Sequence, residues 1–339
     1  MNLDSLGVKE ALDKFTDQVK VCYEQAFASN IEKVDCENVL ISGMGGSSNA
    51  AKLIQGLYEA DLNIPIFPYN DYGLPAWVNN KTLVISNSYS GNTEENLSTI
   101  EAAQKIGASV IGVATAGKIA QMITEGSIKG AIINPGDTNP TRFPKTGLGV
   151  SLGGLFGALT KAGVLPNVDK ELELALEEVS EVKKTWGVKE TAEFLHGASP
   201  VLFCGRPFLG ALNAGRNAMC EISRNFTQFY EFPEVNHVLI EATQKPEIVK
   251  NNFKYLFFES QFLHDRIKLR YEITKDIFSR QGLSTKSYVL STTTKLSQAL
   301  ELAYFCANVA YELSMLDNTD PGPEPWIIEL KTKLSQPVH

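Results

Sequence analysis

Two short loops rich in glycine and hydroxyl side chains hold the residues whose types and spacing point to chemistry. The first loop covers residues 43–48 (Gly-Met-Gly-Gly-Ser-Ser), and the second covers residues 88–93 (Ser-Tyr-Ser-Gly-Asn-Thr). Each loop follows an apolar run and precedes a stretch of helical spacing, so free amides and the positive end of a helix dipole face it. The pattern favours a phosphate site over simple strand-to-helix turns. Four hydroxyl groups are candidates to bind the anion: Ser47, Ser88, Ser90 and Thr93.

Two glycine patterns match nucleotide-binding motifs only in part. Gly43 and Gly45 are spaced like the start of a dinucleotide fingerprint, but Ser48 replaces the third glycine, and no acidic residue ends the second strand about 20 positions later. Residues 112–119 nearly match a nucleotide phosphate loop, but Ile119 replaces the serine or threonine that binds magnesium. The sequence therefore disfavours NAD and predicts no cofactor.

One arginine follows the fifth strand-like run. Arg142 lies in the proline-rich segment 140–147, so we expect it at the same carboxyl edge of the sheet as the two loops. A loop arginine is most often simply solvated. Its position beside the inferred anion site makes Arg142 a candidate site residue.

Five short apolar runs are the elements that must position these loops. They cover residues 38–44, 64–70, 82–90, 108–115 and 130–135, with helical stretches at 48–59, 94–106 and 119–125. The runs are continuous rather than alternating, which is typical of strands buried on both faces of a parallel sheet. With the strand order 2-1-3-4-5, the two loops would meet where the order reverses, between the first and third strands.

The same alternation of strand and helix starts again in the second half of the chain. Strands are expected at 201–204, 228–230, 255–260 and 286–290, with helices at 210–224, 265–281 and 294–316. Residues 3–34 have helical spacing, and a mostly helical bridge follows the first unit. The predicted fold is α/β, with two doubly wound parallel sheets. The predicted boundaries are an N-terminal helical segment over 1–35, a first domain over 36–160, the bridge over 161–190, and a second domain with a C-terminal helix over 191–339.

The composition allows two sizeable cores and excludes several function classes. The 339 residues are 43% hydrophobic and 21% charged, ordinary values for a globular chain of about two domains. The net charge of −8 has the wrong sign for a protein that neutralises nucleic-acid phosphates. The sequence contains neither a secretion leader nor an apolar run long enough to span a membrane. Five widely spaced cysteines predict no disulfide framework and no zinc site, and they favour the reducing cytoplasm.

The chain resembles the bifunctional phosphoglucose/phosphomannose isomerases of the sugar isomerase (SIS) domain superfamily. The paired loops are typical of any SIS domain, whereas Glu221, the Asn236-His237 pair and the terminal Lys331 together indicate the isomerase branch. The resemblance covers about residues 38–335, and its matches come in the family's order. They are the two loops, Arg142, Cys204-Gly205-Arg206, Glu221, Asn236-His237, Asp320-Pro321-Gly322-Pro323 and Leu330-Lys331.

The resemblance implies a catalytic role for four of these residues. Glu221 would be the base, since one carboxylate placed over C1 and C2 of a sugar can move a proton between them through a cis-enediol. Arg142 would stabilise the negative intermediate, and His237 and Lys331 would serve ring opening. The resemblance therefore implies interconversion of glucose 6-phosphate and fructose 6-phosphate, with no metal.

The resemblance also extends the phosphate site and implies a partner. Gly45 and Gly46 would hold the substrate phosphate together with the four loop hydroxyls. The family implies a homodimer whose active sites lie at the subunit interface, with His237 donated by the second copy.

Without the family, the same residues have plainer interpretations. Glu221 would be a charge on a helix surface, Lys331 a solvated lysine of a C-terminal helix, and His237 a loop residue after a proline turn. The spacing of His237 and Glu241 could suit a metal, but no third ligand cluster accompanies them.

Two segments depart from the family pattern. The arginine segment has an extra residue before Gly147, and Leu148 stands where an aromatic residue is common. Mannose 6-phosphate activity in the family is associated with a threonine ahead of the terminal lysine. Residues 320–330 contain none, and Glu324 lies about two turns before Lys331. Whether mannose 6-phosphate is a substrate stays open.

Two other functions compete with the isomerase. One is a sugar-phosphate-binding regulator or sensor that kept the anion loops and lost catalysis. The presence of Glu221, His237 and Lys331 together argues against it. The other is an isomerase domain of an amidotransferase, which is disfavoured because the sequence contains no glutaminase domain and begins Met1-Asn2, without a nucleophilic cysteine.

Overall fold

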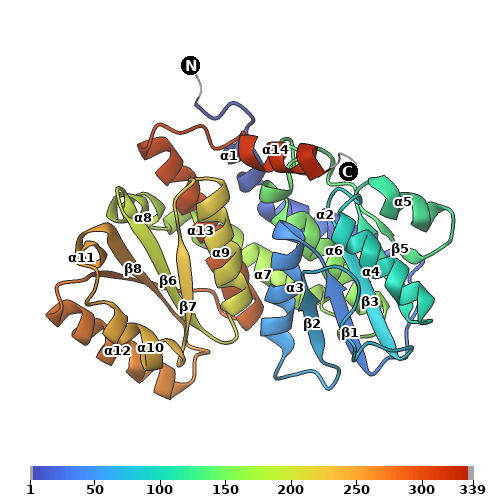
Figure 1. Ribbon diagram of the computed structural model, residues 1–339, viewed down its shortest axis with the longest axis horizontal. Coiled ribbons are helices and arrows are strands. Elements are labelled where there is room, and N and C mark those ends of the chain that lie inside the picture. The colour runs from blue at the N-terminus through green and yellow to red at the C-terminus, as the bar shows by residue number, and fades with distance from the viewer. Residues whose placement is uncertain (1–2, 335–339) are drawn as a thin grey trace.

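A computed structural model describes residues 3–334, and a parallel β-sheet lies at the centre of each of its two halves (Figure 1). The N-terminal sheet has the order β2-β1-β3-β4-β5, as predicted. Its strands are β1 (Asn38–Ser42), β2 (Ile66–Tyr69), β3 (Thr82–Ser88), β4 (Ser109–Ala114) and β5 (Lys129–Ile132). Because β1 and β3 are parallel neighbours, their carboxyl ends lie side by side where the order reverses.

Helices cover both faces of this sheet. They are α3 (Gly45–Tyr58), α4 (Glu94–Lys105), α5 (Gly117–Thr124) and α6 (Leu148–Lys161). Alternate side chains of β1 enter different clusters: Ile41 packs in the cluster that contains Leu53 of α3, and Leu40 packs with Ala103 of α4. All seven residues of β3 are buried. This two-sided burial explains why the strands are continuous apolar runs in the sequence.

The second half contains a four-stranded parallel sheet in the order β7-β6-β8-β9. The strands are β6 (Ser199–Gly205), β7 (Gln228–Phe232), β8 (Phe253–Glu259) and β9 (Ser284–Val289). Its helices are α9 (Leu209–Glu221), α10 (Val235–Ala242), α11 (Ile248–Asn252), α12 (Asp265–Arg280), α13 (Lys295–Leu316) and α14 (Pro325–Leu334). Aromatic rings fill its core: the ring of Phe203 lies 4.8 Å from that of Phe257 and 6.2 Å from that of Phe278.

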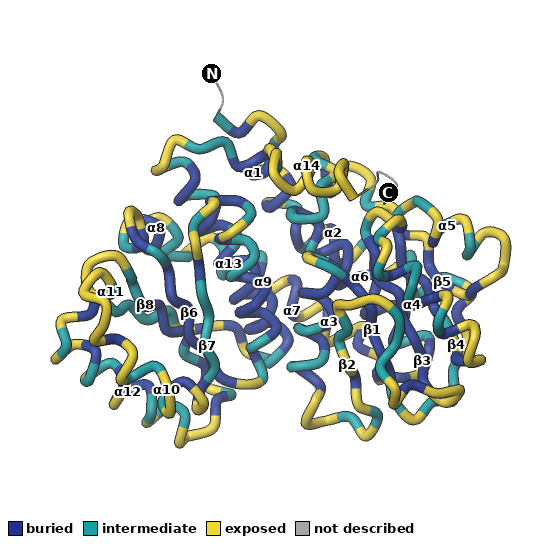
Figure 2. Tube along the Cα trace, in the orientation of Figure 1, coloured by how far each residue is buried: buried dark blue, intermediate teal, exposed yellow. Residues whose placement is uncertain are grey.

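The two halves share one continuous apolar core. Two helices start the chain and two bridge the halves: α1 (Val8–Asp13), α2 (Phe15–Phe27), α7 (Asp169–Val182) and α8 (Val188–Leu195), with short 3₁₀ turns η1 (Gly136–Thr138), η2 (Pro144–Thr146) and η3 (Lys183–Thr185). Phe15 of α2 stacks on Tyr304 of α13 at 4.8 Å. Buried residues are concentrated in the sheets and where α3, α9 and α13 meet (Figure 2). The halves are therefore packed against each other rather than joined by a linker.

The predicted helices need two corrections. The helix expected over residues 3–34 is interrupted at Lys14 and ends at Phe27, where the hydroxyl of Ser29 donates to the carbonyl of Ala26 at 2.6 Å and competes with further helix. Helices α10 and α11 were not expected.

Within the described residues, no helix is long and apolar enough to cross a membrane. The domain boundaries stay a prediction.

Candidate active site

The first glycine loop becomes the start of α3, at the carboxyl end of β1. The helix begins at Gly45, and Ser47 is buried in its first turn. The Oγ atom of Ser47 accepts a hydrogen bond from the amide of Tyr89 at 3.2 Å, and the side-chain amide of Asn87 donates to the carbonyl of Ser47 at 3.0 Å. The first loop is thus bonded directly to the end of β3, where the second loop begins.

The second loop runs from the last residue of β3 to the first turn of α4. The hydroxyls of Ser88 and Thr93 lie 2.9 Å apart, and Ser90 is exposed between them. The amide of Gly91 donates to the Oγ atom of Ser88 at 3.1 Å. Gly91 has a φ of +68°, and a Cβ atom there would lie 1.8 Å from the carbonyl oxygen of Ala116. Only glycine allows this close turn.

These two loops gather the features of an anion site at one edge of the sheet. Neither α3 nor α4 has a side-chain hydrogen bond that caps its N-terminus. Their first-turn amides, the positive ends of both helix dipoles and the neighbouring hydroxyls can therefore act on one phosphate group. The structure brings together Gly45, Gly46, Ser47, Ser88, Ser90 and Thr93.

Arg142 lies on the loop that follows β5, at the same edge. Its side chain is exposed, and its backbone has a φ of +57°. Buried Asn139 organises the loop: its side-chain amide donates to the hydroxyl of Tyr89 at 2.8 Å, and its Oδ1 atom accepts from Thr146 at 2.9 Å. The positive charge of Arg142 acts on Tyr89, which lies between Ser88 and Ser90. Arg142 is thus placed beside the second loop.

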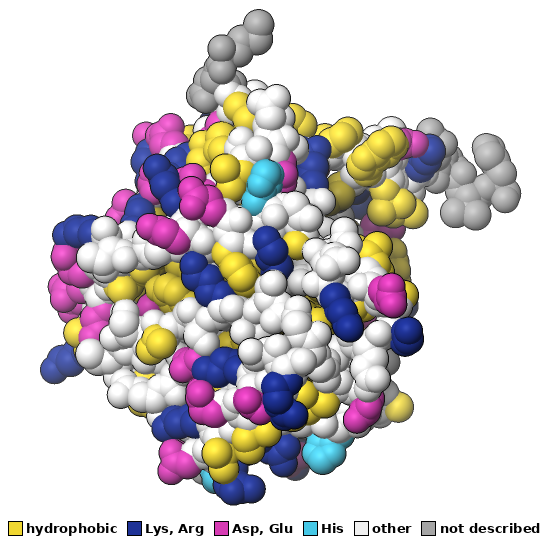
Figure 3. Space-filling model, turned by 90° about the vertical axis from the view of Figure 1, so that its left-hand side faces the viewer, with side chains coloured by type: hydrophobic (Ala, Val, Ile, Leu, Met, Phe, Trp, Pro, Cys, Tyr) yellow, Lys and Arg dark blue, Asp and Glu magenta, His cyan; other side chains and the backbone are white. Residues whose placement is uncertain are grey.

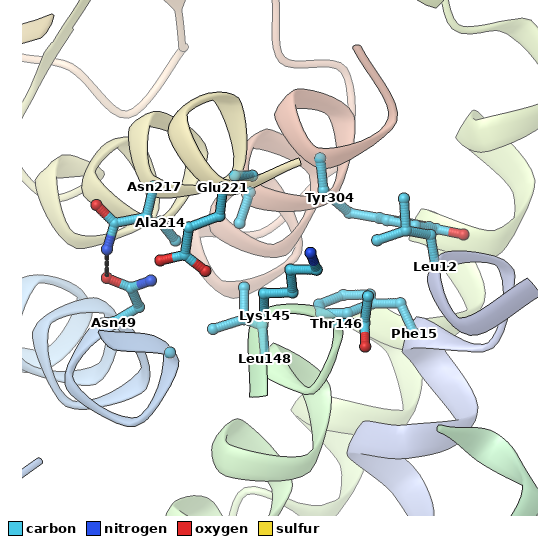
Figure 4. Close-up of a pocket in the computed structure, with 14 residues that line it drawn as sticks. Leu12, Phe15, Asn49, Lys145, Thr146, Leu148, Ala214, Asn217, Glu221 and Tyr304 are labelled. Atoms are coloured by element: carbon cyan, nitrogen blue, oxygen red, sulfur yellow. Dashed lines mark hydrogen bonds between the residues drawn. The ribbon is translucent and has the colours of Figure 1, made fainter. Parts of the chain in front are cut away.

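Glu221 lies across a small cavity from the first loop. It is the last residue of α9, and the cavity of about 30 Å³ is also lined by Gly46 and Asn49 of α3 and by Lys145 of η2. Figure 4 shows the Glu221 carboxylate and the Lys145 side chain entering the same space from α9 and η2. This volume holds one or two water molecules, so a hexose fits only if lining side chains move.

The surroundings of Glu221 raise its pKa to about 7. Loss of contact with water is the largest cause, and the negative charge of Glu324 acts in the same direction. The positive charges of Lys145, Lys331 and Arg216 oppose the shift. A carboxyl group that titrates near neutral pH can both accept and return a proton under ordinary conditions.

Lys331 reaches this group from the last helix of the described chain. It lies on α14, it is exposed, and its charge acts on Glu221. The structure therefore places Lys331 and Glu221 in one electrostatic environment, although 110 positions separate them in the sequence (331 − 221).

Among the predicted site residues, Gly46 and Glu221 line this cavity, whereas His237 lies away from it. His237 is exposed on α10, and α10 lies at the opposite end of the C-terminal half from α14 (Figure 1). The expectation of a loop position was wrong, because residues 235–242 after the proline turn form two helical turns. On the face of the C-terminal half shown in Figure 3, acidic and basic side chains are interspersed.

Several residues around Glu221 were not predicted from the sequence. The Oδ1 atom of Asn49 accepts hydrogen bonds from the side-chain amides of Asn213 at 2.6 Å and Asn217 at 2.8 Å, which joins α3 to the helix that carries Glu221. The i, i+4, i+8 spacing of Asn213, Asn217 and Glu221 could have indicated one polar helix face. Lys145 was overlooked although it lies three positions after Arg142.

The described residues contain no group of three or more His, Cys, Asp and Glu side chains arranged to hold a metal ion. The pair of His237 and Glu241, considered from its spacing, is therefore not extended by a third ligand within residues 3–334.

Two solved structures superpose on more than nine-tenths of this chain. Glucosamine-6-phosphate deaminase from Thermotoga maritima superposes with a TM-score of 0.69 at 18% identity, covering 94% of this chain and 98% of that one. Tagatose-6-phosphate ketose/aldose isomerase from Escherichia coli gives a TM-score of 0.69 at 13% identity, covering 92% and 96%. At these identities the likeness shows the fold.

Relatives with similar sequences cover nearly the whole chain. Residues 187–334 match the model of the bacterial phospho-glucose isomerase C-terminal SIS domain. A bifunctional phosphoglucose/phosphomannose isomerase from Caldicellulosiruptor bescii is 27% identical, with 96% of this chain and 98% of the relative covered. One from Thermoplasma acidophilum is also 27% identical, with 95% and 98% covered. Residues 187–334 therefore match a bacterial phospho-glucose isomerase C-terminal SIS domain, and nearly the whole chain is similar to bifunctional phosphoglucose/phosphomannose isomerases.

Proposed function

We propose that this protein is a sugar-phosphate isomerase that interconverts glucose 6-phosphate and fructose 6-phosphate. The observation that carries the proposal is the shared cavity: the helix that starts at the first glycine loop and the carboxylate of Glu221 line it together. A phosphate held by the loops would direct the rest of the sugar toward a group whose pKa is about 7. The names of the relatives support the same reaction class.

The proposed reaction moves one proton between neighbouring carbons. The Glu221 carboxylate takes the proton from C2 of the open-chain aldose, the C2 electron pair forms the C1–C2 double bond, and O1 receives a proton, which gives a cis-enediol. Glu221 then returns its proton to C1, while O2 loses a proton and becomes the ketone oxygen. One carboxylate serves both carbons because each adds or loses a proton on the same face of the planar intermediate.

The other residues have supporting roles in this proposal. The guanidinium of Arg142 stabilises negative charge on the enediol oxygens. Lys331 and His237 transfer protons to and from the ring oxygen and the anomeric hydroxyl during ring opening. Because His237 lies away from the cavity of its own chain, we propose that a second copy donates it and that the protein works as a homodimer. All these steps use side chains of the protein.

The competing proposal is a sensor that binds sugar phosphates without converting them. The pKa of Glu221 favours the enzyme, because a binding site has no need for a carboxyl group that titrates near neutral pH. The five cysteines are all unpaired, which agrees with the reducing cytoplasm as the proposed location.

A coupled assay of fructose 6-phosphate conversion to glucose 6-phosphate tests the function. Wild type should turn over, and Glu221→Gln should lose about a thousandfold or more in kcat while it still binds the sugar, because the amide cannot accept the proton. A wild-type protein that binds hexose 6-phosphates without turnover supports the sensor instead. The same assay with mannose 6-phosphate decides whether that epimer is also a substrate.

A further inference from the structure

A short segment near the C-terminus packs against Lys145, which lines the cavity, and is held by two cations. We call residues 320–324 (Asp-Pro-Gly-Pro-Glu) the C-terminal strap. The ammonium of Lys145 donates to the carbonyl oxygens of Pro321 at 2.8 Å and Gly322 at 2.6 Å. Arg224 donates to the carbonyl oxygens of Asp320 at 2.8 Å and Pro323 at 2.5 Å. Lys145 comes from the N-terminal half and Arg224 from the C-terminal half, so the strap connects both.

The contact between Lys145 and Glu324 differs from the other ion pairs of the described residues. Their charged atoms lie 3.4 Å apart, and the side chains are 2% and 10% exposed. In each of the other pairs that join described residues, both side chains are at least 23% exposed. A buried ion pair contributes little net stability, because desolvation of both charges offsets their attraction. A role other than stability is therefore needed to explain this pair.

The pair lies directly beside the proposed base, and its two charges act on it in opposite directions. Glu324 raises the pKa of Glu221, and Lys145 lowers it. The other charges that face Glu221 are Lys331 on α14 and Arg216 on α9, both positive. Because Lys145 and Glu324 are held together, Glu221 meets a nearly balanced pair instead of one uncompensated charge.

The strap also fixes the N-terminal end of α14, the helix that carries Lys331. None of the described side chains of α14 is buried, and Trp326 is 79% exposed (Figure 2). A helix without a buried face cannot be placed by its own packing. Its position depends on the strap that precedes it, and the strap depends on Lys145, Glu324 and Arg224.

We propose that Lys145 and Glu324 are positioning residues for the isomerase site: the pair holds the C-terminal strap over Glu221 and sets the charge that this base meets. The inference deepens the proposed function and rests on it. Neither residue takes part in the proton transfer. Their effect is on the protonation of Glu221 and on the placement of Lys331.

The first test is the dependence of kcat/KM on pH for wild type and Glu324→Gln. Removing the negative charge should lower the pKa of Glu221 and move the acidic limb of the profile by about half a pH unit toward lower pH. Glu329→Gln is the matched control, because Glu329 lies on the neighbouring helix in an exposed ion pair with Lys333. Its profile should coincide with that of wild type. If the acidic limb of the Glu324→Gln profile also coincides with that of wild type, the electrostatic part of the proposal is overturned.

The second test removes the docking of the strap. Lys145→Met should increase amide hydrogen exchange across residues 320–334 and lower kcat about tenfold with KM within about twofold, because a displaced catalytic group costs rate more than binding. Lys145→Arg keeps the charge and the donors and should recover most of the rate. If Lys145→Met does not fold, the double variant Lys145→Met/Glu324→Leu replaces the whole pair with apolar groups and should stay folded. If a folded variant that lacks the pair keeps the kcat of wild type and its amide hydrogen exchange across residues 320–334, the proposal that the pair holds the strap in place is overturned.

The outcomes separate this inference from the proposed function. A wild-type protein without isomerase activity contradicts the function, whereas titration of the Glu221 carboxyl by NMR and exchange of the strap remain measurable. If the wild type is active but neither Glu324→Gln nor Lys145→Met changes the pKa of Glu221 or the amide hydrogen exchange of the strap, only the role of the pair is contradicted.

Discussion

At the residue scale, the pKa of Glu221 determines how the enzyme should respond to pH. As the proposed base, Glu221 works as a carboxylate, so kcat/KM should rise through an acidic limb with a midpoint near pH 7, the value to which its surroundings raise the pKa. A pH profile of the coupled assay measures the limb. A rate that stays constant from about pH 5.5 to 8 would contradict the assignment of Glu221 as the titrating base.

The same shift predicts an effect on stability. In the unfolded chain Glu221 has its ordinary pKa of 4.5, and in the folded protein the pKa is about 7. Between these values the folded state keeps a proton that the unfolded state has lost, so this group makes the fold less stable as pH rises. Glu221→Gln removes the charge and should raise the free energy of unfolding by about 2 kcal/mol at pH 8, with little change at pH 4. Denaturant titrations at both pH values check this, and an equal effect at both would refute it.

The loop hydroxyls should contribute to binding rather than to chemistry. Ser88→Ala and Thr93→Val each remove one hydrogen bond to the phosphate, so KM should rise about tenfold while kcat stays within about twofold. Ser127→Ala is the control, because Ser127 lies ahead of β5 at the opposite edge of the sheet and its hydroxyl bonds to the carbonyl of Met122. If KM is unchanged in both loop variants, the phosphate binds elsewhere.

At the element scale, the side chain of Asn49 joins α3, which starts at the first glycine loop, to α9, which carries Glu221. Asn49→Ala leaves the buried side-chain amide of Asn213 and the partly buried one of Asn217 without their acceptor and should lower the free energy of unfolding by about 2 kcal/mol. Asn217 lies one turn before Glu221, so kcat should fall as well. Asn79→Ala, in an exposed turn, is the control. Lower stability with an unchanged kcat would show that the bonds between α3 and α9 are structural only.

At the scale of the whole molecule, the position of His237 predicts how two copies share a site. Glu221→Gln and His237→Ala should each be inactive alone. If the partner copy donates His237, a mixed dimer of the two variants has one complete site and one doubly defective site. Equal mixing after dissociation and reassociation makes half of the dimers mixed, so about a quarter of wild-type activity should return. Recovery of no activity, with mixed dimers verified by mass, would place His237 outside the shared site.

Much of the fold could be predicted from short segments. The order of the first sheet and the meeting of the two loops were correct, because continuous apolar runs indicate a parallel sheet and its connections follow few rules. The position of His237 in α10 was not recognised, since a proline turn followed by eight helical residues has a weak periodic signal. Lys145 looked like an ordinary loop lysine, because its burial against residues 321–324 depends on a segment about 180 positions later.

The sequence by itself determined the two loops that we propose to hold the phosphate, because glycines, hydroxyls and helix starts act through local geometry within a few residues of each other. The tertiary structure alone decided the electrostatics of Glu221. Loss of contact with water raises its pKa most, and the charges that act on it come from Lys145 on η2, Arg216 on α9, Glu324 on the C-terminal strap and Lys331 on α14. Their effect on the base depends on distance and on loss of water, and both exist only after the two halves and the C-terminal strap have packed together.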